Sequence, residues 1–550
     1  MHIFGKIKNG DDVLYYEKRV CILYCALVLA ASVLLVRLYN LSKPETNLSL
    51  AVLDGQYTAR VEVTQRSGFV YDRNGQVISH NAAGKTALVN PAECDDALSC
   101  ADKLSKISLV ASTSEIYEKL SDGAPFTLAV KPSAQTYDVD GVYVFNIYEE
   151  NKDIAKHFLG YNNIDGIGMC GLRRAYGDFL GYKLKSRVSA SFETNAKRIS
   201  LSPFVMNTEK YLSQDGVVTT LDRQLQTFCD SLGKDIDSGA VVVAEADSGK
   251  LLALSSFPDY DAENIESVLN SDRGELVNRV TESFTPGSVF KMVVAAAALE
   301  EDENYFDYKY TCSGTIQAGS GTFRCHKISG YGEVSMEEAF AQSCNTYFIN
   351  LGKSVGMENI LETMKKLELD KCTEADFLME TKNFFPNGDY ASESYVANIS
   401  FGQGDLCLSP LDMTRITVAV STGELVSLYS IEGEIRDDVF VKNEMGGKKR
   451  IFRESTCKKM RQIMKMCVDE GTGKSAKIYG VNTGGKTATA QTGRFDRDGV
   501  EYVHKWFCGV YPIENPRFSI CVLIDNEKDE NVSPSVIFGK ICSFLLENDM

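Results

Sequence analysis

The sequence predicts an α+β fold for the C-terminal half of the chain, with an antiparallel sheet flanked by helices. Two apolar runs joined by an Asp-Ser-Gly turn at 239–258 are typical of a β-hairpin. Further strand patterns return near the end of the chain, at 482–492, 502–511 and 517–525. Helical patterns fill roughly 287–367 and recur at 454–469. Strands at both ends with helices between them favour a sheet whose first and last strands are neighbours.

An uncharged apolar run at 20–36 predicts a membrane helix near the N-terminus. The run is at the lower limit for a bilayer core of about 30 Å, and residues up to 39 extend it. Four basic residues precede it, so the positive-inside rule keeps the N-terminus in the cytoplasm and places the rest of the chain outside. A cleaved signal peptide is the rival interpretation, but the run is long for one and no small-x-small site follows it.

These patterns predict four segments. They are a cytoplasmic tail (1–19), a transmembrane signal-anchor helix (20–39), an elongated mixed α/β region (40–215) and a second domain (216–550). In the mixed region, alternating runs predict strands and amphipathic runs predict helices, at 61–65, 97–108, 113–123 and 141–148. The region shows no nucleophile beside a base, which favours a scaffold.

Charge and cysteine usage exclude several classes of function. The net charge of -17 argues against a nucleic-acid surface, which needs clustered Lys and Arg. The 16 cysteines are scattered without CxxC pairs and only five histidines are present, so we expect neither a metal site nor a cofactor. Cys312 and Cys325 suit either a disulfide, if they lie outside the cell, or two buried thiols.

The segment 284–300 carries the first candidate reactive pair, Ser288 and Lys291. Pro286 and Gly287 break the preceding chain, and the apolar run after them predicts a helix buried nearly all round. Ser288 lies in the first turn, where the helix dipole favours developing negative charge. Lys291 shares a face with it, and a desolvated lysine has a lowered pKa and can accept a hydroxyl proton. An ordinary serine cap with a nearby lysine gives the same spacing.

Two more motifs follow in order. Ser343-Cys344-Asn345 comes about fifty residues later, and by itself it is what a helix cap would give. The segment 484–493 then puts Lys486, Thr487 and Thr489 on a strand that opens with two glycines. Small residues there let a peptide lie alongside as an added strand, although a solvated edge strand guarded by a lysine has the same pattern. Together, the three motifs are the signature set of penicillin-recognising serine enzymes.

In these motifs and beyond them, the sequence resembles a class B penicillin-binding protein, a monofunctional D,D-transpeptidase of the division, elongation or sporulation type. Residues 66–75 and 155–181 are similar to the pedestal domain of that family, although Arg173 stands where the family usually has an acid. Residues 401–413 and 469–487 are similar to landmarks of its transpeptidase domain. The resemblance covers nearly the whole chain, from the anchor to about residue 518, and implies a pedestal at 40–215 and a penicillin-binding transpeptidase domain at 216–550.

The resemblance implies the catalytic roles. Ser288 would attack the D-Ala-D-Ala carbonyl of a peptidoglycan stem peptide, release the terminal D-Ala and become an acyl-enzyme, with Lys291 as its base. Ser343 would relay the proton toward the leaving amine, and Asn345 would hydrogen-bond the peptide. An amine from a neighbouring stem peptide would then resolve the ester and form the crosslink. β-Lactam antibiotics would acylate Ser288 by the same path.

It also implies the groups that bind substrate. Lys486 and the hydroxyls of Thr487 and Thr489 would hold the terminal carboxylate, and the backbone N–H groups of Ser288 and Thr489 would form the oxyanion hole. The family's Lys-Thr pair is normally followed by Gly, but position 488 is Ala here. Alternation puts its methyl on the side of Lys486, so we expect slower β-lactam acylation.

Two alternatives remain open. A β-lactamase or an antibiotic sensor shares the motifs, but a lactamase needs no pedestal and a sensor needs more membrane helices and a cytoplasmic output domain. A catalytically weak wall-synthesis scaffold would use the anchor and pedestal to activate a partner. The sequence shows no glycan-polymerising domain, so either an enzyme or a scaffold implies a polytopic membrane glycosyltransferase as partner.

Overall fold

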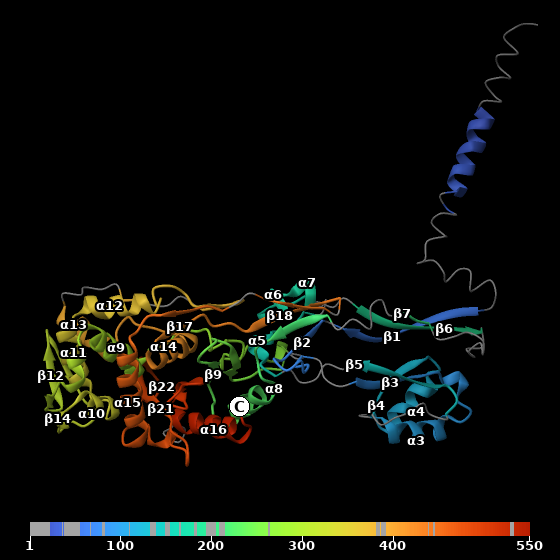
Figure 1. Cartoon of the computed structure of the whole chain (residues 1–550). Coiled ribbons are helices and arrows are strands. Elements are labelled where there is room, and N and C mark those ends of the chain that lie inside the picture. The colour runs from blue at the N-terminus through green and yellow to red at the C-terminus, as the bar shows by residue number, and fades with distance from the viewer. Residues whose placement is uncertain are drawn as a thin grey trace, which may run out of the picture. The chain divides into compact units, whose positions relative to one another are not determined.

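A computed structural model gives the structure of the chain (Figure 1). It describes residues 22–35, 37, 56–66, 68–79, 83–108, 111–131, 139–148, 154–163, 167–180, 184–193, 205–207, 215–261, 265–380, 385–386, 392–437, 439–443, 446–527 and 533–550. Residues 22–35 are helical, and within the described ranges no helix has both the length and the apolarity needed to cross a bilayer. The predicted span, 20–39, lies partly outside the described residues.

The chain forms two compact units. The first contains Met1–Gln65, Ala83–Tyr148 and Leu184–Glu209, and the second contains the remainder, Arg66–Ala82, Glu149–Lys183 and Lys210–Met550. The segments 66–82 and 149–183 therefore belong to the same compact unit as the C-terminal half, although they precede residue 215. The functional domain boundaries drawn from the sequence stay a prediction.

The first unit contains two three-stranded sheets, β4-β3-β5 and β1-β6-β7. The bounds of its elements are β1 (Gln56–Arg66), β3 (Ala83–Val89), a 3-10 turn (Pro91–Glu93), α3 (Ala97–Ile107), α4 (Thr113–Ser121), β4 (Phe126–Val130), β5 (Val142–Tyr148), β6 (Leu184–Glu193) and β7 (Val205–Asn207). The helices α3 and α4 present their apolar faces to a shared core with β3 and β4. Both helices begin at capping side chains, those of Asp96 and Ser112, which accept hydrogen bonds from first-turn N–H groups.

The second unit is built on a five-stranded antiparallel sheet with the order β10-β9-β23-β22-β21. Its strands are β9 (Gly239–Glu245), β10 (Leu251–Phe257), β21 (Gly484–Phe495), β22 (Glu501–Tyr511) and β23 (Phe518–Glu527). The predicted hairpin at 239–258 is confirmed, and so is the pairing of the first strands with the last. Because β23 lies between β9 and β22, the end of the chain supplies the central strand, and β21 stands at one edge.

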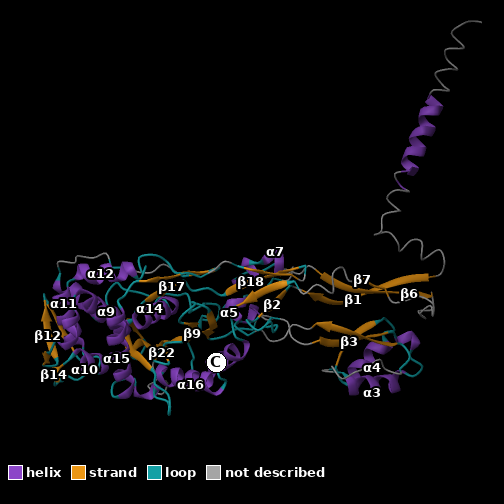
Figure 2. Ribbon diagram, viewed as in Figure 1, coloured by secondary structure: helices purple, strands orange, loops and turns teal. Residues whose placement is uncertain are grey.

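Helices cover both faces of this sheet (Figure 2). One face packs on α8 (Arg223–Ser231) and α16 (Pro534–Glu547), with Val241 and Val243 of β9 pointing into that core. The other face packs on a larger helical layer that holds α9 (Lys291–Glu301) and the helices around it. The other helices of this unit are α5 (Lys156–Leu159), α6 (Gly171–Ala175), α7 (Gly177–Leu180), α10 (Met336–Ala341), α11 (Asn345–Val355), α12 (Met357–Lys366), α13 (Glu393–Ser400), α14 (Pro410–Thr422) and α15 (Glu454–Asp469).

A second sheet of this unit has the order β19-β18-β8-β2 and joins distant parts of the sequence. The parallel pairing of β2 with β8 ties the segment after residue 66 to the C-terminal half. The smaller strands of the unit are β2 (Phe69–Tyr71), β8 (Gly216–Thr219), β15 (Glu374–Ala375), β16 (Leu378–Met379), β17 (Glu424–Val426), β18 (Ile431–Arg436), β19 (Val439–Lys442) and β20 (Lys448–Arg450).

The helical pattern predicted over 287–367 is wrong between residues 310 and 334. This stretch forms four short strands, β11 (Tyr310–Cys312), β12 (Thr315–Ala318), β13 (Gly321–Arg324) and β14 (Gly332–Val334). They pair as β12-β13 and β11-β14. Glycines with positive φ, such as Gly314 and Gly330, make the turns that a helix cannot accommodate.

A buried carboxyl pair joins the β15-β16 hairpin to α14. Glu380 accepts hydrogen bonds from the N–H of Thr373 and the hydroxyl of Ser409, and Thr373 Oγ1 donates to Asp412 Oδ1 at 2.8 Å. Glu380 is 6% exposed and Asp412 is fully buried. Burial, and then the neighbouring Asp412 carboxylate, raises the pKa of Glu380 to about 8 from 4.5.

This raised pKa makes stability depend on pH. The folded protein favours the protonated Glu380 carboxyl. The contribution of this group to the free energy of unfolding is therefore fully present below the unfolded pKa of 4.5 and is lost as pH rises through about 8. We expect Glu380→Gln, which keeps a neutral side chain, to exceed wild type by roughly 1–3 kcal/mol in free energy of unfolding at pH 9, with little difference at pH 5. Urea unfolding at both pH values measures this. Exposed Glu358→Gln is the matched control, and an equal gap at the two pH values would contradict the prediction.

Candidate active site

Ser288 lies in a 3-10 turn that leads into the buried helix α9. The turn spans Gly287–Phe290, and α9 begins at Lys291. A 3-10 turn has three residues per turn, so side chains three positions apart lie one above the other. The serine and the lysine are thus stacked more directly than a regular α-helical first turn would place them.

Two hydrogen bonds to the main chain hold this turn and the residues just before it. The N–H of Gly287 donates to the carbonyl of Gly402 at 2.8 Å, and the indole N–H of Trp506 donates to the carbonyl of Thr285 at 3.1 Å. Gly287 has φ +58, and a Cβ there would stand 2.9 Å from the Cβ of Ala490 and 3.5 Å from that of Ala488. The glycine therefore allows β21 to lie directly against the turn.

Lys291 is fully buried and holds the second motif in place. Its Nζ donates to Asn345 Oδ1 at 2.8 Å, to the Ser343 carbonyl at 2.9 Å and to Ser343 Oγ at 3.2 Å. The amine also lies 5.4 Å from the ring centroid of Phe348. Burial, followed by repulsion from Lys486, holds the pKa of Lys291 well below its usual value.

Ser343 lies in a tight connection between α10 and α11, with φ +54. This left-handed conformation is uncommon for a residue other than glycine. On its C-terminal side, Cys344 caps α11 through a bond from the Tyr347 N–H to its Sγ. Asn345 Nδ2 donates to the Arg324 carbonyl at 3.0 Å, so the motif is tied to the β12-β13 hairpin as well as to Lys291.

The side chains of the third motif lie on opposite faces of β21. Lys486 and Ala488 are buried, whereas Thr489 is exposed and Thr487 is half-buried. Lys486 Nζ donates to the Thr487 carbonyl at 2.8 Å and lies 5.6 Å from the ring centroid of Phe340. Burial lowers the pKa of Lys486. The predicted shared face of Lys486 and Ala488 is present, and the effect of this methyl on acylation stays a prediction.

A groove of about 720 Å³ runs between the turn, the second motif and β21. Among the predicted residues, those that line it are Ser288, Ser343, Asn345, Thr487, Ala488 and Thr489. Lys291 and Lys486 lie beneath this surface with no exposed area. Two other hollows, of about 640 and 670 Å³, contain none of the predicted reactive side chains.

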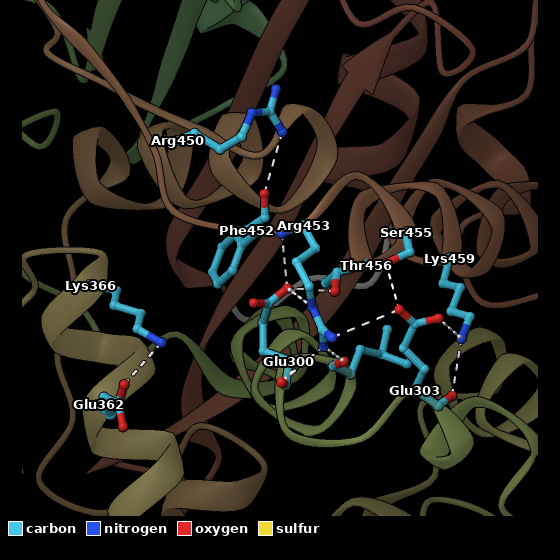
Figure 3. A network of polar contacts seen from close by, with 11 residues as sticks. Glu300, Glu303, Glu362, Lys366, Arg450, Phe452, Arg453, Ser455, Thr456 and Lys459 are labelled. Atoms are coloured by element: carbon cyan, nitrogen blue, oxygen red, sulfur yellow. Dashed lines mark hydrogen bonds and ion pairs between the residues drawn. The ribbon is translucent and has the colours of Figure 1, made fainter.

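The far end of α9 is anchored by a network of polar contacts to the start of α15 (Figure 3). Glu300 accepts from the Arg453 N–H at 3.0 Å and from the hydroxyl of Thr456. Glu303 pairs with Lys459 at 3.0 Å. Each partly exposed ion pair contributes little, but together the bonds hold the helix against sliding along its axis.

The structure brings all seven predicted site residues to this groove or directly beneath it. Sequence reasoning missed several others that shape the site. Trp506 and Gly402 fix the serine turn, Thr472 shares a hydrogen bond with Thr487, and Arg324 lines the groove. The segments 401–413 and 469–487 resemble family landmarks, which is a signal for Gly402 and Thr472 but assigns neither a role.

Comparisons with known proteins agree with this site. A family model described as the penicillin binding protein transpeptidase domain matches residues 239–543. Stage V sporulation protein D of Bacillus subtilis is 28% identical over 496 residues, covering 84% of this chain and 74% of that protein. Peptidoglycan D,D-transpeptidase MrdA of Acinetobacter baumannii is 24% identical over 540 residues, covering 84% of this chain and 77% of that protein.

The fold also matches solved structures. A chain from a structure of a peptidoglycan synthase complex, which concerns the coordination of polymerization and crosslinking, has a TM-score of 0.65 at 19% identity. The alignment covers 96% of this chain and 97% of that chain. The family match covers more than half of the chain, and the three motifs meet at one groove. The chain therefore belongs to the penicillin-binding protein transpeptidase family, as a class B member.

Proposed function

We propose that this chain is a peptidoglycan D,D-transpeptidase that crosslinks stem peptides through an acyl-enzyme at Ser288. The observation that carries the proposal is the arrangement at Lys291, where a buried amine lies one 3-10 turn from the serine and is held by the second motif. Membership of the family and the names of the relatives support the same chemistry. The names carried by relatives also support roles in division, elongation or sporulation, between which the site does not discriminate.

Lys291 acts as the base for Ser288. A neutral amine has two N–H donors and one lone pair, and two carbonyl oxygens within 2.9 Å, on Ser343 and Asn345, accept the two donors. The third contact, with Ser343 Oγ at 3.2 Å, then runs from the hydroxyl to the lone pair, so the lone pair is placed to accept a hydroxyl proton. Ser288 Oγ attacks the carbonyl carbon of the penultimate D-Ala, its proton passes to Lys291, and the proton returns through Ser343 to the departing D-Ala amine. A neighbouring amine later attacks the ester carbonyl, the bond from that carbon to Ser288 Oγ breaks, and the amine's proton passes by the same groups back to Ser288 Oγ.

The edge strand β21 supplies the binding surface. It ends the five-stranded sheet, so a substrate peptide can add to it as a further strand. We assign the terminal carboxylate to the hydroxyls of Thr487 and Thr489, with the positive charge of Lys486 beneath them. The N–H groups of Ser288 and Thr489 stabilise the tetrahedral oxyanion.

We propose further that residues 20–39 anchor the chain in the cell membrane with the N-terminus in the cytoplasm, that 40–215 is the pedestal domain and that 216–550 is the catalytic domain. The apolar run with preceding basic residues supports this topology. The similarity of fold to a chain of a peptidoglycan synthase complex supports a polytopic glycosyltransferase as partner.

Covalent labelling tests the nucleophile. We expect a fluorescent penicillin to form a long-lived adduct with the wild-type chain, seen as a band on a denaturing gel, and Ser288→Ala to form none. A strain that lacks the protein gives a second test. If the chain is a transpeptidase, Ser288→Ala fails to complement that strain, whereas a scaffold tolerates the change. Rapid turnover of the penicillin without an adduct would point instead to a β-lactamase.

The lowered pKa of Lys291 predicts the pH dependence of acylation. A base must be neutral, so the acylation rate should stay nearly level at alkaline pH and fall as pH drops through the lowered pKa. Lys291→Arg keeps the charge at every pH, and we expect it to lose on the order of 10²-fold or more in rate. Stopped-flow acylation between pH 5 and about 9 measures both. A wild-type rate that still rises about tenfold per pH unit at pH 9, as a base with the ordinary lysine pKa of 10.5 requires, would contradict the assignment.

The contact between Gly287 and β21 predicts a strict size limit. A Cβ at position 287 meets Ala490 at 2.9 Å, so we expect Gly287→Ala to slow acylation by on the order of tenfold or more. Ala490→Gly in the same chain should restore part of the rate because it removes the contact. Gly499→Ala is the matched control, since Gly499 also has positive φ, +80, but no atom within 4 Å. Equal effects of the two glycine substitutions would show that backbone conformation, not contact, is responsible.

A further inference from the structure

Three buried cysteines converge directly behind the second catalytic motif. Cys312 ends β11, Cys325 follows β13, and Cys344 caps α11. Their exposed fractions are 2%, 4% and 0%. Cys325 Sγ lies 3.7 Å from Cys312 Sγ and 3.6 Å from Cys344 Sγ, and all three Sγ atoms lie within 4.8 Å of one another. All three are free thiols, so the disulfide considered for Cys312 and Cys325 is not formed.

A fourth atom completes this cluster. The hydroxyl of Thr346, also fully buried, lies 3.1 Å from Cys312 Sγ, 3.5 Å from Cys325 Sγ and 3.4 Å from Cys344 Sγ. Three sulfurs and one oxygen therefore occupy the corners of a compact tetrahedron. Five of the six edges are between 3.1 and 3.7 Å, and the sixth, between Cys312 Sγ and Cys344 Sγ, is within 4.8 Å. A regular tetrahedron with edges of about 3.6 Å has its centre about 2.2 Å from each corner, close to the usual Zn–S distance of about 2.3 Å and Zn–O distance of about 2.0–2.2 Å.

The surroundings suit a cation bound by thiolates. The backbone N–H groups of Thr346 and Tyr347 donate to Cys325 Sγ at 3.4 Å and to Cys344 Sγ at 3.5 Å. These donors lie at the start of α11, where the partial positive charge of the helix stabilises thiolates. Thiolate sulfur is a soft ligand that selects Zn²⁺ and Cu⁺ over Mg²⁺ or Ca²⁺. The cluster is nearly buried, and Cys325, which also lines the groove, gives a cation a way in from that side.

We propose that Cys312, Cys325 and Cys344, with the hydroxyl of Thr346 as the fourth group, bind one thiophilic metal ion, Zn²⁺ or Cu⁺. The site joins three segments that the catalytic groove also uses. Cys344 is the middle residue of the second motif, and Asn345 already bonds to the carbonyl of Arg324, next to Cys325. A bound ion therefore fixes the strained Ser343 connection and the hairpin beside it. This last step, an effect on acylation, rests on the proposed function, whereas metal binding does not.

The test uses the full-length chain, purified in detergent under anaerobic, reducing conditions. The protein is incubated with Zn²⁺ in one arm and Cu⁺ in the other, separated from free metal, and analysed for metal per chain. We expect about one ion per wild-type chain and almost none for Cys325→Ser. Cys521→Ser is the matched control, because Cys521 pairs with Cys508 at 3.4 Å in the sheet and belongs to no group of three thiols among the described residues. The arm that retains its ion identifies the metal.

A second measurement needs no variant and so does not depend on its folding. Metal should protect the three thiols of the wild-type protein from alkylation, mapped by mass spectrometry, and leave Cys94 and Cys407 as reactive as before. Cysteines 312, 325 and 344 that are alkylated equally with and without metal would overturn the proposal. So would a disulfide between any two of them in the protein as isolated. Penicillin labelling with and without metal reports separately on acylation at Ser288. If the chain forms no penicillin adduct, the proposed function fails, but the measurement of metal binding remains valid.

Discussion

The buried amine of Lys291 is the interaction on which the catalytic half of the chain depends. Its bonds to the Ser343 carbonyl and to Asn345 Oδ1, at 2.9 and 2.8 Å, join the helix that starts beside the serine to the connection between α10 and α11. Burying a lysine completely costs folding free energy unless its N–H donors are hydrogen-bonded to acceptors. The surrounding helical layer therefore has to place those two oxygens accurately, and the same placement prepares the amine for chemistry. Stability and reactivity impose one geometry here.

Much of this arrangement could be predicted because it depends on local pattern. The spacing of Ser288 and Lys291, the alternation along the Lys486 strand and the hairpin at 239–258 each follow from the period of a helix or a strand. The pairing of β9 with β23 followed from the order of strands and helices. Each of these predictions depends on patterns of residues that are close together in the sequence, so a single sequence is enough to make it.

Features that arise from packing could not be predicted in the same way. The serine turn packs Gly287 against Ala490, which is some two hundred residues away in sequence. The strands between residues 310 and 334 are three or four residues long, and next to strong helical patterns such strands leave little periodic signal. The three cysteines behind the second motif come from separate elements, and their spacing matches no compact ligand motif.

The place of β23 in the sheet has a consequence for how the chain acquires its structure. This strand lies between β9 and β22, yet it begins at Phe518, close to the end of the chain. During synthesis, the edge of β9 that pairs with β23 stays open until residues 518–527 have been made, long after β9 itself. Contacts so far apart in sequence form slowly. Until then the open edge of β9 can pair with other chains, and a truncation that reaches residues 518–527 removes the middle of the sheet rather than its margin.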